Sequence, residues 1–245
     1  MIRRLEICES TNDEAARWAR DGAAHGSVVV ANAQTRGRGR LGRTWQSPPG
    51  DNLYFSIVLR PSLPPKDAAP ITLAAGVAVA EALASFGITP ELKWPNDVLV
   101  GGKKISGILS EMSTRGMKLE HVIVGVGLNV KSHPNDLLAT SMRAVLVDRA
   151  APRSADARAG EIDREVVRER VCAELLSWCD LFVAEGPTVI VDRWKTFANF
   201  LGKKVSVSAG VEKLSGIAED LEPDGALRLR KDDGQTVRIV AGELQ

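Results

Sequence analysis

Closely spaced strand patterns between residues 91 and 130 constrain the fold more than any other part of this sequence. Alternating or apolar runs occupy 91–94, 97–100, 103–112 and 120–130, with turns at Gly101-Gly102 and Arg115-Gly116. Short turns of this kind join antiparallel neighbours, whereas parallel neighbours need a crossover of a dozen residues or more. We therefore expect an α+β fold with a mixed, largely antiparallel sheet, and not a fold of repeating βαβ units.

The remaining patterns predict two units of unequal size. In the larger unit we expect strands over 2–7, 27–33 and 53–59 and helices over 13–24, 71–86, 161–185 and 188–199, with no clear element over 131–160. Thr11 and Glu14 have the spacing of a capping box at the first of these helices. After Gly202, short strands at 205–208, 214–219, 226–230 and 237–240 alternate with turns, as in a small β-barrel. These patterns predict one domain over 1–199 and a second over 200–245.

Composition is that of a soluble globular protein with no basic surface at large. Of the 245 residues 44% are apolar and 26% charged, and the net charge is +1. Three cysteines, with no CxxC pair, do not make a disulfide framework, and we expect Cys172 and Cys179 to be buried packing residues. The start of the chain has no signal-peptide core, and Pro70 and Glu81 interrupt the most apolar stretch. We expect a cytoplasmic protein without a membrane span.

An arginine-glycine segment follows the strand expected at 27–33. It reads Gly37-Arg38-Gly39-Arg40-Leu41-Gly42-Arg43, Arg36 precedes it, and no acidic residue stands between Asp21 and Asp51. Glycine lets a backbone approach a ligand and arginine binds carboxylates and phosphates bidentately, so the segment suits a bound anion. Its G-x-G-x-x-G spacing is not a dinucleotide-binding motif, because residues 44–49 that follow cannot open a helix. For the segment alone, a flexible basic loop without a ligand stays an alternative.

Other segments allow both a structural and a functional interpretation. Lys93-Trp94-Pro95-Asn96-Asp97 is a turn or a ligand-binding segment, and Lys104 is a solvated lysine or a cation of the site. Gly125-Val126-Gly127-Leu128-Asn129 places glycines inside a strand, which is typical where a backbone or a ligand comes close. Ser10-Thr11-Asn12 is a helix cap or a set of hydrogen-bonding groups, and Gln34 by itself is an ordinary polar residue.

Taken together, these segments resemble the biotin protein ligases. The matching segments, in order, are Ser10-Thr11-Asn12, Gln34 with 37–45, Lys93-Trp94-Pro95-Asn96-Asp97, Lys104-Ile105-Ser106-Gly107-Ile108-Leu109 and Gly125-Val126-Gly127-Leu128-Asn129-Val130. The resemblance covers most of residues 1–130, and the C-terminal β unit is similar to the SH3-like cap of that family. It implies a biotinyl/lipoyl ligase-like sheet with helices on one face.

The resemblance also implies an activity in two steps. Biotin and ATP would give biotinyl-5′-AMP and pyrophosphate, and a lysine of a biotin carrier domain would then take the biotinyl group. Bringing a carboxylate to a polyphosphate is opposed by like charge, so cations and Mg²⁺ are expected to take part, with no dedicated protein metal site.

The resemblance assigns roles residue by residue. It implies catalytic roles for Arg38, Arg40, Lys104 and Asp97. It implies biotin binding by Ser10, Thr11, Asn12, Gln34, Gly37, Arg38, Gly39, Arg40, Lys104, Gly107 and Gly125. It implies ATP or AMP binding by Arg38, Arg40, Arg43, Trp45, Lys93, Asn96, Lys104 and Asn129. The arginine-glycine segment is expected to close over the adenylate once biotin is bound.

Two other functions are compatible with parts of the sequence. A lipoate ligase would share the adenylation chemistry, and an RNA-binding module would place Arg36–Arg43 on phosphates. The small net charge and the 4% aromatic content argue against RNA. Because Ser10 lies so near the first residue, we expect no N-terminal helix-turn-helix and no nucleic-acid partner. A homodimer is left open.

Overall fold

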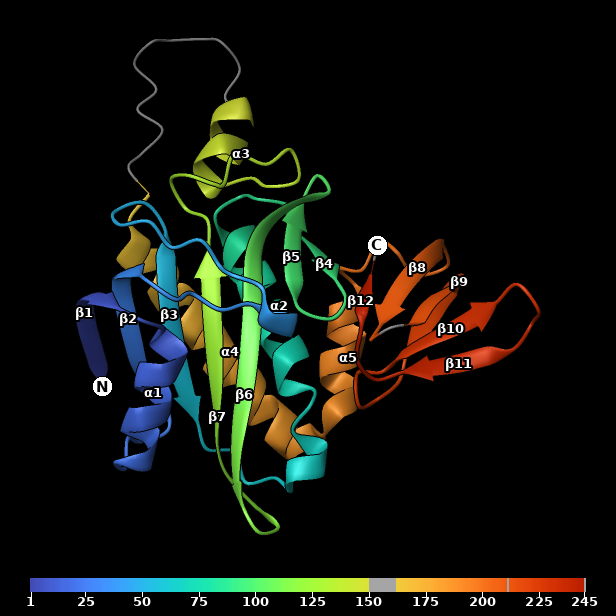
Figure 1. Ribbon diagram of the computed structural model, residues 1–245, viewed down its shortest axis with the longest axis horizontal. Coiled ribbons are helices and arrows are strands. Elements are labelled where there is room, and N and C mark those ends of the chain that lie inside the picture. The colour runs from blue at the N-terminus through green and yellow to red at the C-terminus, as the bar shows by residue number, and fades with distance from the viewer. Residues whose placement is uncertain (150–161, 211, 245) are drawn as a thin grey trace.

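The computed structural model describes residues 1–149, 162–210 and 212–244, which form two sheets with helices packed around the larger one (Figure 1). The helices are α1 (Thr11–Arg20), α2 (Ile71–Ser85), α3 (Met142–Arg149), α4 (Arg164–Glu185) and α5 (Pro187–Lys195), with short 3₁₀ turns at Arg40–Gly42 and Pro65–Asp67.

The large sheet has seven strands in the order β1-β2-β3-β7-β6-β5-β4. Their bounds are β1 (Ile2–Cys8), β2 (Ser27–Gln34), β3 (Leu53–Leu59), β4 (Glu91–Lys93), β5 (Asp97–Val100), β6 (Lys103–Arg115) and β7 (Lys118–Leu128). Only β1 and β2 pair in parallel. The expected mixed, largely antiparallel sheet is therefore confirmed, as are the hairpins from β4 to β7.

Most helices cover one face of this sheet, as expected. α2, α4 and α5 pack on one another and share one hydrophobic cluster with the sheet. α1 differs from the expectation, because it lies on the opposite face in front of β2, β3 and β7 (Figure 1). A separate apolar cluster that includes Trp18, Val29 and Ile123 holds it there. The N-terminus of α1 thereby reaches the middle of the sheet.

The expected capping box at α1 is wrong. The helix begins at Thr11, and the preceding Ser10 makes no side-chain cap hydrogen bond. Glu14 instead accepts a hydrogen bond from Arg17, and the Thr11 hydroxyl is used by residues from other strands. Tertiary partners bind the Thr11 hydroxyl, and a neighbour in the same helix binds Glu14, so neither side chain forms the local motif.

Helix α2 is the centre of the core. The segment Pro65–Ser85 has the length and composition of a membrane span, but 72% of its most apolar window is buried inside the protein, as in a core helix. Cys172 and Cys179 of α4 are also buried, which confirms their packing role, and burial raises the pKa of each thiol to about 11.

The second sheet has five strands in the order β11-β10-β9-β8-β12 and forms the expected SH3-like unit. Its strands are β8 (Lys204–Ala209), β9 (Glu212–Leu221), β10 (Leu227–Lys231), β11 (Thr236–Ile239) and β12 (Glu243–Leu244). Its apolar side chains belong to the same cluster as those of α2, and the Trp94 indole N–H donates to the Gly225 carbonyl over 2.9 Å. The C-terminal unit is therefore packed against the large sheet, with β12 turned toward it (Figure 1).

Two helices differ from the sequence prediction or can be compared with it only in part. No element was expected over 131–160, yet α3 forms at Met142–Arg149. The long helix was expected to begin at Glu161, which lies outside the described residues. Within the described residues this helix, α4, begins at Arg164.

Candidate active site

A cavity of about 120 Å³ lies where the arginine-glycine segment, the N-terminus of α1 and the strands β5, β6, β7 and β12 meet. We call residues 36–46 the Arg/Gly loop. The polar and glycine residues of α1, β2, β3, β6 and β7 beneath this loop are called the floor. The predicted site residues that line the cavity are Ser10, Thr11, Asn12, Gln34, Arg38, Gly39, Arg40, Arg43, Trp45, Asn96, Asp97, Lys104, Gly107 and Gly125.

One end of the floor is a buried chain of neutral hydrogen bonds. Gln34 Oε1 accepts from the Thr11 amide over 2.8 Å and from its hydroxyl over 3.1 Å. The Ser56 hydroxyl lies 2.8 Å from the Thr11 hydroxyl and 2.6 Å from Asn12 Oδ1, and can donate to either. Gln34 Nε2 donates to the Ser47 hydroxyl over 2.9 Å. These fixed donors and acceptors can orient a polar, uncharged group of a ligand.

Glycines in the floor make room for side chains. A Cβ at Gly125 would overlap the carboxamide of Asn12, and one at Gly127 would overlap the indole ring of Trp45. A Cβ at Gly107 would come within 3.0 Å of the same indole. The close approach expected of these strand glycines is therefore seen, and here it is made by side chains from α1 and from the Arg/Gly loop.

Lys104 brings a positive charge to the opposite end of the floor. Its Nζ lies 2.6 Å from Asp97 Oδ1 and 5.6 Å from the centre of the Trp45 ring. Its main chain is held on both sides, because its N–H donates to the Leu138 carbonyl and its carbonyl accepts from the Thr140 amide. The ammonium group is thus placed at the cavity by a fixed backbone.

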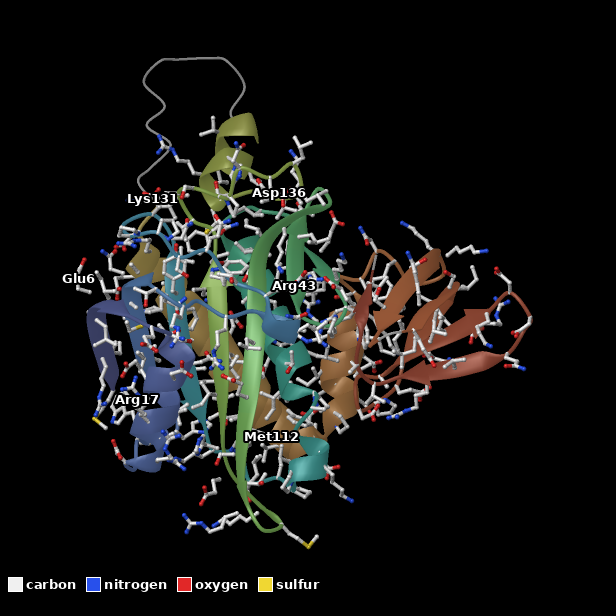
Figure 2. The ribbon with its side chains drawn as sticks, in the orientation of Figure 1. Glu6, Arg17, Arg43, Met112, Lys131 and Asp136 are labelled. Atoms are coloured by element: carbon white, nitrogen blue, oxygen red, sulfur yellow. The ribbon has the colours of Figure 1, made fainter. Side chains whose placement is uncertain are left out.

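Two arginines of the loop face the C-terminal unit. Arg40 Nη1 donates to Asn96 Oδ1 over 3.1 Å and to the Gly242 carbonyl over 3.2 Å, and burial lowers its pKa. Arg43, on the side of the loop toward the second sheet (Figure 2), forms a bidentate ion pair with Glu243 of β12. This hydrogen bonding lowers the pKa of Glu243 and raises that of Arg43.

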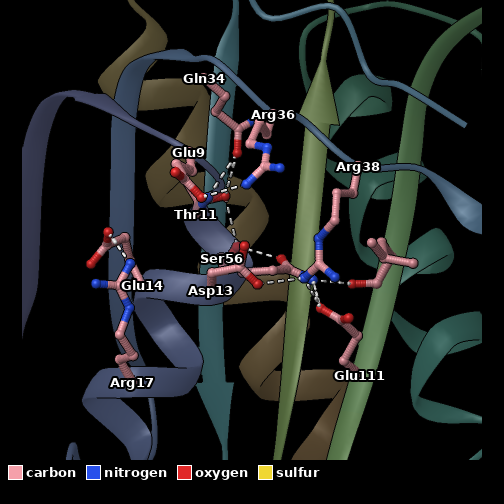
Figure 3. Close-up of polar contacts among 12 residues, drawn as sticks. Glu9, Thr11, Asp13, Glu14, Arg17, Gln34, Arg36, Arg38, Ser56 and Glu111 are labelled. Atoms are coloured by element: carbon pink, nitrogen blue, oxygen red, sulfur yellow. Dashed lines mark hydrogen bonds and ion pairs between the residues drawn. The ribbon is translucent and has the colours of Figure 1, made fainter. Parts of the chain in front are cut away.

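Arg38 faces the other way, toward α1 and β6. Figure 3 shows its guanidinium between two carboxylates, and its Nη2 lies 2.8 Å from Asp13 Oδ1 and 2.9 Å from Glu111 Oε2. Arg38 is therefore held by α1 and β6, and Arg40 and Arg43 by Asn96 and the C-terminal unit. All three arginines line the cavity.

Three predicted site residues do not line the cavity. Gly37 closes the base of the loop, where its carbonyl accepts from the Trp45 amide over 2.9 Å. Asn129 is buried and its Nδ2 donates to the Thr140 carbonyl over 3.0 Å. Lys93 lies in β4 beside the segment that carries Asn96. Their ligand contacts stay predictions.

Sequence reasoning missed four polar residues of the site. Ser56 is fully buried in a strand that otherwise contains only apolar and aromatic residues, and this lone hydroxyl was a usable signal. Asp13, Glu111 and Glu243 carried no such signal in the sequence, because each acts through a partner that is far away along the chain.

The arrangement can bind an anion next to a polar, partly apolar group. Lys104, Arg38 and Arg40 line the cavity with cations, and Thr11 and Gln34 line it with neutral hydrogen-bonding groups. The buried Ser56 hydroxyl supports Thr11 from behind. Among the described residues no group of three or more His, Cys, Asp or Glu side chains could hold a metal ion.

Family models match both units of the chain. The model described as "Biotin/lipoate A/B protein ligase family" matches residues 5–129, and "Biotin protein ligase C terminal domain" matches residues 200–245.

Relatives in sequence extend over nearly the whole chain. It is 34% identical over 244 residues to the biotin–[acetyl-CoA-carboxylase] ligase of Paracoccus denitrificans, covering 98% of each protein. It is 32% identical over 236 residues to the bifunctional ligase/repressor BirA of Bacillus subtilis, covering 94% of this chain and 69% of the relative.

Solved structures give the same fold. The biotin protein ligase from Aquifex aeolicus in complex with biotin and ATP superposes with a TM-score of 0.79 at 28% identity, covering 100% of this chain and 97% of that one.

Proposed function

The chain belongs to the biotin/lipoate A/B protein ligase family, and we propose that it joins biotin to ATP and then transfers the biotinyl group to a carrier lysine. It is an ATP-dependent biotin protein ligase, and the acetyl-CoA carboxylase biotin carrier is its protein substrate. The observation that carries the proposal is the convergence of Arg38, Arg40 and Lys104 on one cavity that is also lined by the neutral polar side chains of Thr11 and Gln34.

The first step forms a mixed anhydride. An oxygen of the biotin carboxylate attacks the α-phosphorus of ATP, the bond to the β-phosphate oxygen breaks, and pyrophosphate leaves with that electron pair. Both reactants are anions, so the nearby guanidinium and ammonium groups lower the barrier by neutralising charge that builds up in the transition state. Arg38, Arg40 and Lys104 take this role, and Lys104 is the best placed because its backbone is fixed.

The second step forms an amide. The neutral amine of a carrier lysine attacks the acyl carbon, AMP leaves, and the amine gives up a proton. Asp97 is the carboxylate of the cavity closest to Lys104, and we assign to it the orientation of Lys104 or the removal of that proton. No protein nucleophile is required.

Biotin lies with its ureido group at the neutral end of the floor. Ser10, Thr11 and Gln34 direct hydrogen bonds to it, and Asn12, Gly39, Gly107 and Gly125 shape the pocket around it. Gly37, at the base of the loop, is assigned to biotin as well. Arg43, Trp45, Asn96, Lys93 and Asn129 are assigned to the nucleotide. The loop closes over the adenylate and keeps water from the anhydride.

Mg²⁺ enters with ATP in this proposal. A small, strongly hydrated ion of this kind is usually held by substrate phosphates and one or two carboxylates. When bound, it neutralises phosphate charge. The division into a catalytic domain over 1–199 and a C-terminal domain over 200–245, a cytoplasmic location, a homodimer and the absence of nucleic-acid binding stay predictions.

The decisive experiment is biotin-dependent pyrophosphate release from ATP by the purified chain. Release with biotin, and covalent biotin on a carrier domain added afterwards, are the expected results. Lipoate is the matched substrate, since it shares the adenylation chemistry. ATP turnover with lipoate and none with biotin would overturn the proposal.

A further inference from the structure

The guanidinium of Arg38 is held by two carboxylates from different elements. Nη2 carries two hydrogens, and the two acceptors within reach are Asp13 Oδ1 at 2.8 Å and Glu111 Oε2 at 2.9 Å. Asp13 belongs to the first turn of α1 and Glu111 to β6, as Figure 3 shows. The loop is therefore attached to both neighbours through one nitrogen.

The two carboxylates act from outside the cavity. Arg38 lines the cavity, and neither Asp13 nor Glu111 does. The remaining donors of the guanidinium, on Nε and Nη1, make no hydrogen bond within residues 1–149, 162–210 and 212–244. Because the guanidinium is planar, fixing one nitrogen from behind sets the direction in which the other N–H groups point.

Glu111 also connects the loop to the floor. The same Oε2 that accepts from Arg38 accepts from Asn12 Nδ2 over 2.7 Å, and Asn12 is buried beside Ser56. A displacement of Glu111 would therefore disturb the loop arginine and the biotin end of the floor together.

We propose that Asp13 and Glu111 are positioning residues that hold Arg38 by Nη2 so that Nε and Nη1 are presented to the substrate anion. This inference rests on the proposed function, because it gives Arg38 a carboxylate or phosphate to bind. The two residues do not touch the substrate. They lower the entropy that Arg38 loses on binding and fix its angle of approach.

The two carboxylates could also act on the substrate through their charge. Two negative charges beside one positive charge could repel an incoming carboxylate, and then removal of either would improve biotin binding. All three side chains are 40–45% exposed, so water screens the charges and weakens the repulsion of an incoming anion. Geometry should then outweigh net charge.

Matched variants distinguish the positioning of Arg38 from the effect of the negative charges of Asp13 and Glu111. Asp13→Asn and Glu111→Gln keep an acceptor oxygen and remove the charge, whereas Asp13→Ala and Glu111→Ala remove both. We expect the alanine variants to raise KM for biotin roughly three- to tenfold with little change in kcat, and the amide variants to stay within about twofold of wild type. Thermal melting of each variant confirms that the fold is retained.

A double-mutant cycle tests whether the effect passes through Arg38. If Asp13 acts only by holding Arg38, the pair Arg38→Ala with Asp13→Ala has the KM of Arg38→Ala alone. Glu9→Ala is the matched control, since Glu9 pairs with Arg36 of the same loop and does not line the cavity. It should leave KM unchanged.

The outcomes distinguish this inference from the function on which it rests. Wild-type KM in both alanine variants, additive effects in the cycle, or tighter biotin binding in the amide variants would each overturn the positioning role while leaving the ligase activity intact. A wild-type chain that releases no pyrophosphate with biotin would remove the proposed function itself.

Discussion

The floor of the cavity and the Arg/Gly loop above it are held by different kinds of contact. Thr11, Asn12 and Ser56 of the floor are at most 4% exposed and bond to one another through neutral groups, and the Asn12 carboxamide also donates to the Glu111 carboxylate. In the loop, the side chains of Arg38 and Arg43 are 42% and 62% exposed and are held by ion pairs. Breaking a buried hydrogen bond costs about 1–3 kcal/mol, whereas exposed ion pairs contribute at most about 1 kcal/mol each. The floor is therefore built in advance, and the loop contacts can be exchanged for those of a ligand.

The largest expected effect is on the chemistry at the floor. Lys104→Met should lower kcat for biotin-dependent pyrophosphate release by about 10²–10³, the cost of removing one fixed charge-stabilising group. Single-turnover pyrophosphate assays measure this. Lys103→Met is the control, because Lys103 is exposed and does not line the cavity. A kcat for Lys104→Met close to wild type would break the distinction between floor and loop.

A smaller effect is expected where a glycine of each region gains a methyl group. In Gly125→Ala the new Cβ overlaps Asn12, so the free energy of unfolding should fall by about 1–3 kcal/mol, as in other overpacked cores. In Gly39→Ala the nearest atoms are 3.5 Å away, and stability should not change. Urea unfolding followed by circular dichroism compares the two. Equal losses would show that the loop is packed as tightly as the floor.

Loss of a loop arginine should release the intermediate. Arg40→Gly removes the hydrogen bonds to Asn96 and Gly242, and a charge-assisted bond contributes about 1.5–3 kcal/mol, so biotinyl-AMP should escape roughly tenfold faster. Labelling of lysines on an added bystander protein measures the escape. Protease cleavage within 36–46, with and without biotin plus ATP, shows whether the loop closes. Unchanged retention and cleavage would contradict the closure model.

The smallest effect is expected at the ion pair between the loop and β12. Arg43→Ala and Glu243→Gln should each raise KM for ATP by no more than about fivefold, and less at high salt, because an exposed pair contributes at most about 1 kcal/mol.

The pH dependence of this pair has a definite sign. Hydrogen bonding to Arg43 lowers the pKa of Glu243, so its contribution is fully present above the ordinary value of 4.5 and is lost as pH falls through the lowered one. The difference between wild type and Glu243→Gln should therefore be constant from neutral pH down to about pH 5. A difference that changes near pH 7 would point to another titrating group.

The elements of the fold were predictable because each rests on local patterns. The glycine turns predict the hairpins formed by β5, β6 and β7, and the apolar run at 71–86 predicts α2. These elements begin and end close to the expected residues. α3 was missed because its sequence has no clear apolar period, and its side chains Val145 and Leu146 pack only partly against the core.

The site was predictable only in part, for a related reason. Arg38 and Lys104 belong to motifs that can be recognised within a few residues. The partners that hold Arg38 are different, since Glu111 is 73 positions away from it and has no motif of its own. The capping-box prediction at Thr11 was wrong because a local pattern cannot reveal a competitor such as Ser56, 45 positions away. Long-range pairing decides which polar side chains are free.

The ion pair between Arg43 and Glu243 joins residues that are 200 positions apart. A ribosome adds about 5–20 residues per second, so roughly 10–40 s separate the synthesis of the two partners. Every strand of the large sheet lies between Ile2 and Leu128 and is therefore synthesised long before Glu243. The floor can then assemble while the loop still lacks its last partner. During translation the floor of the cavity can therefore form before the Arg/Gly loop has all of its side-chain partners.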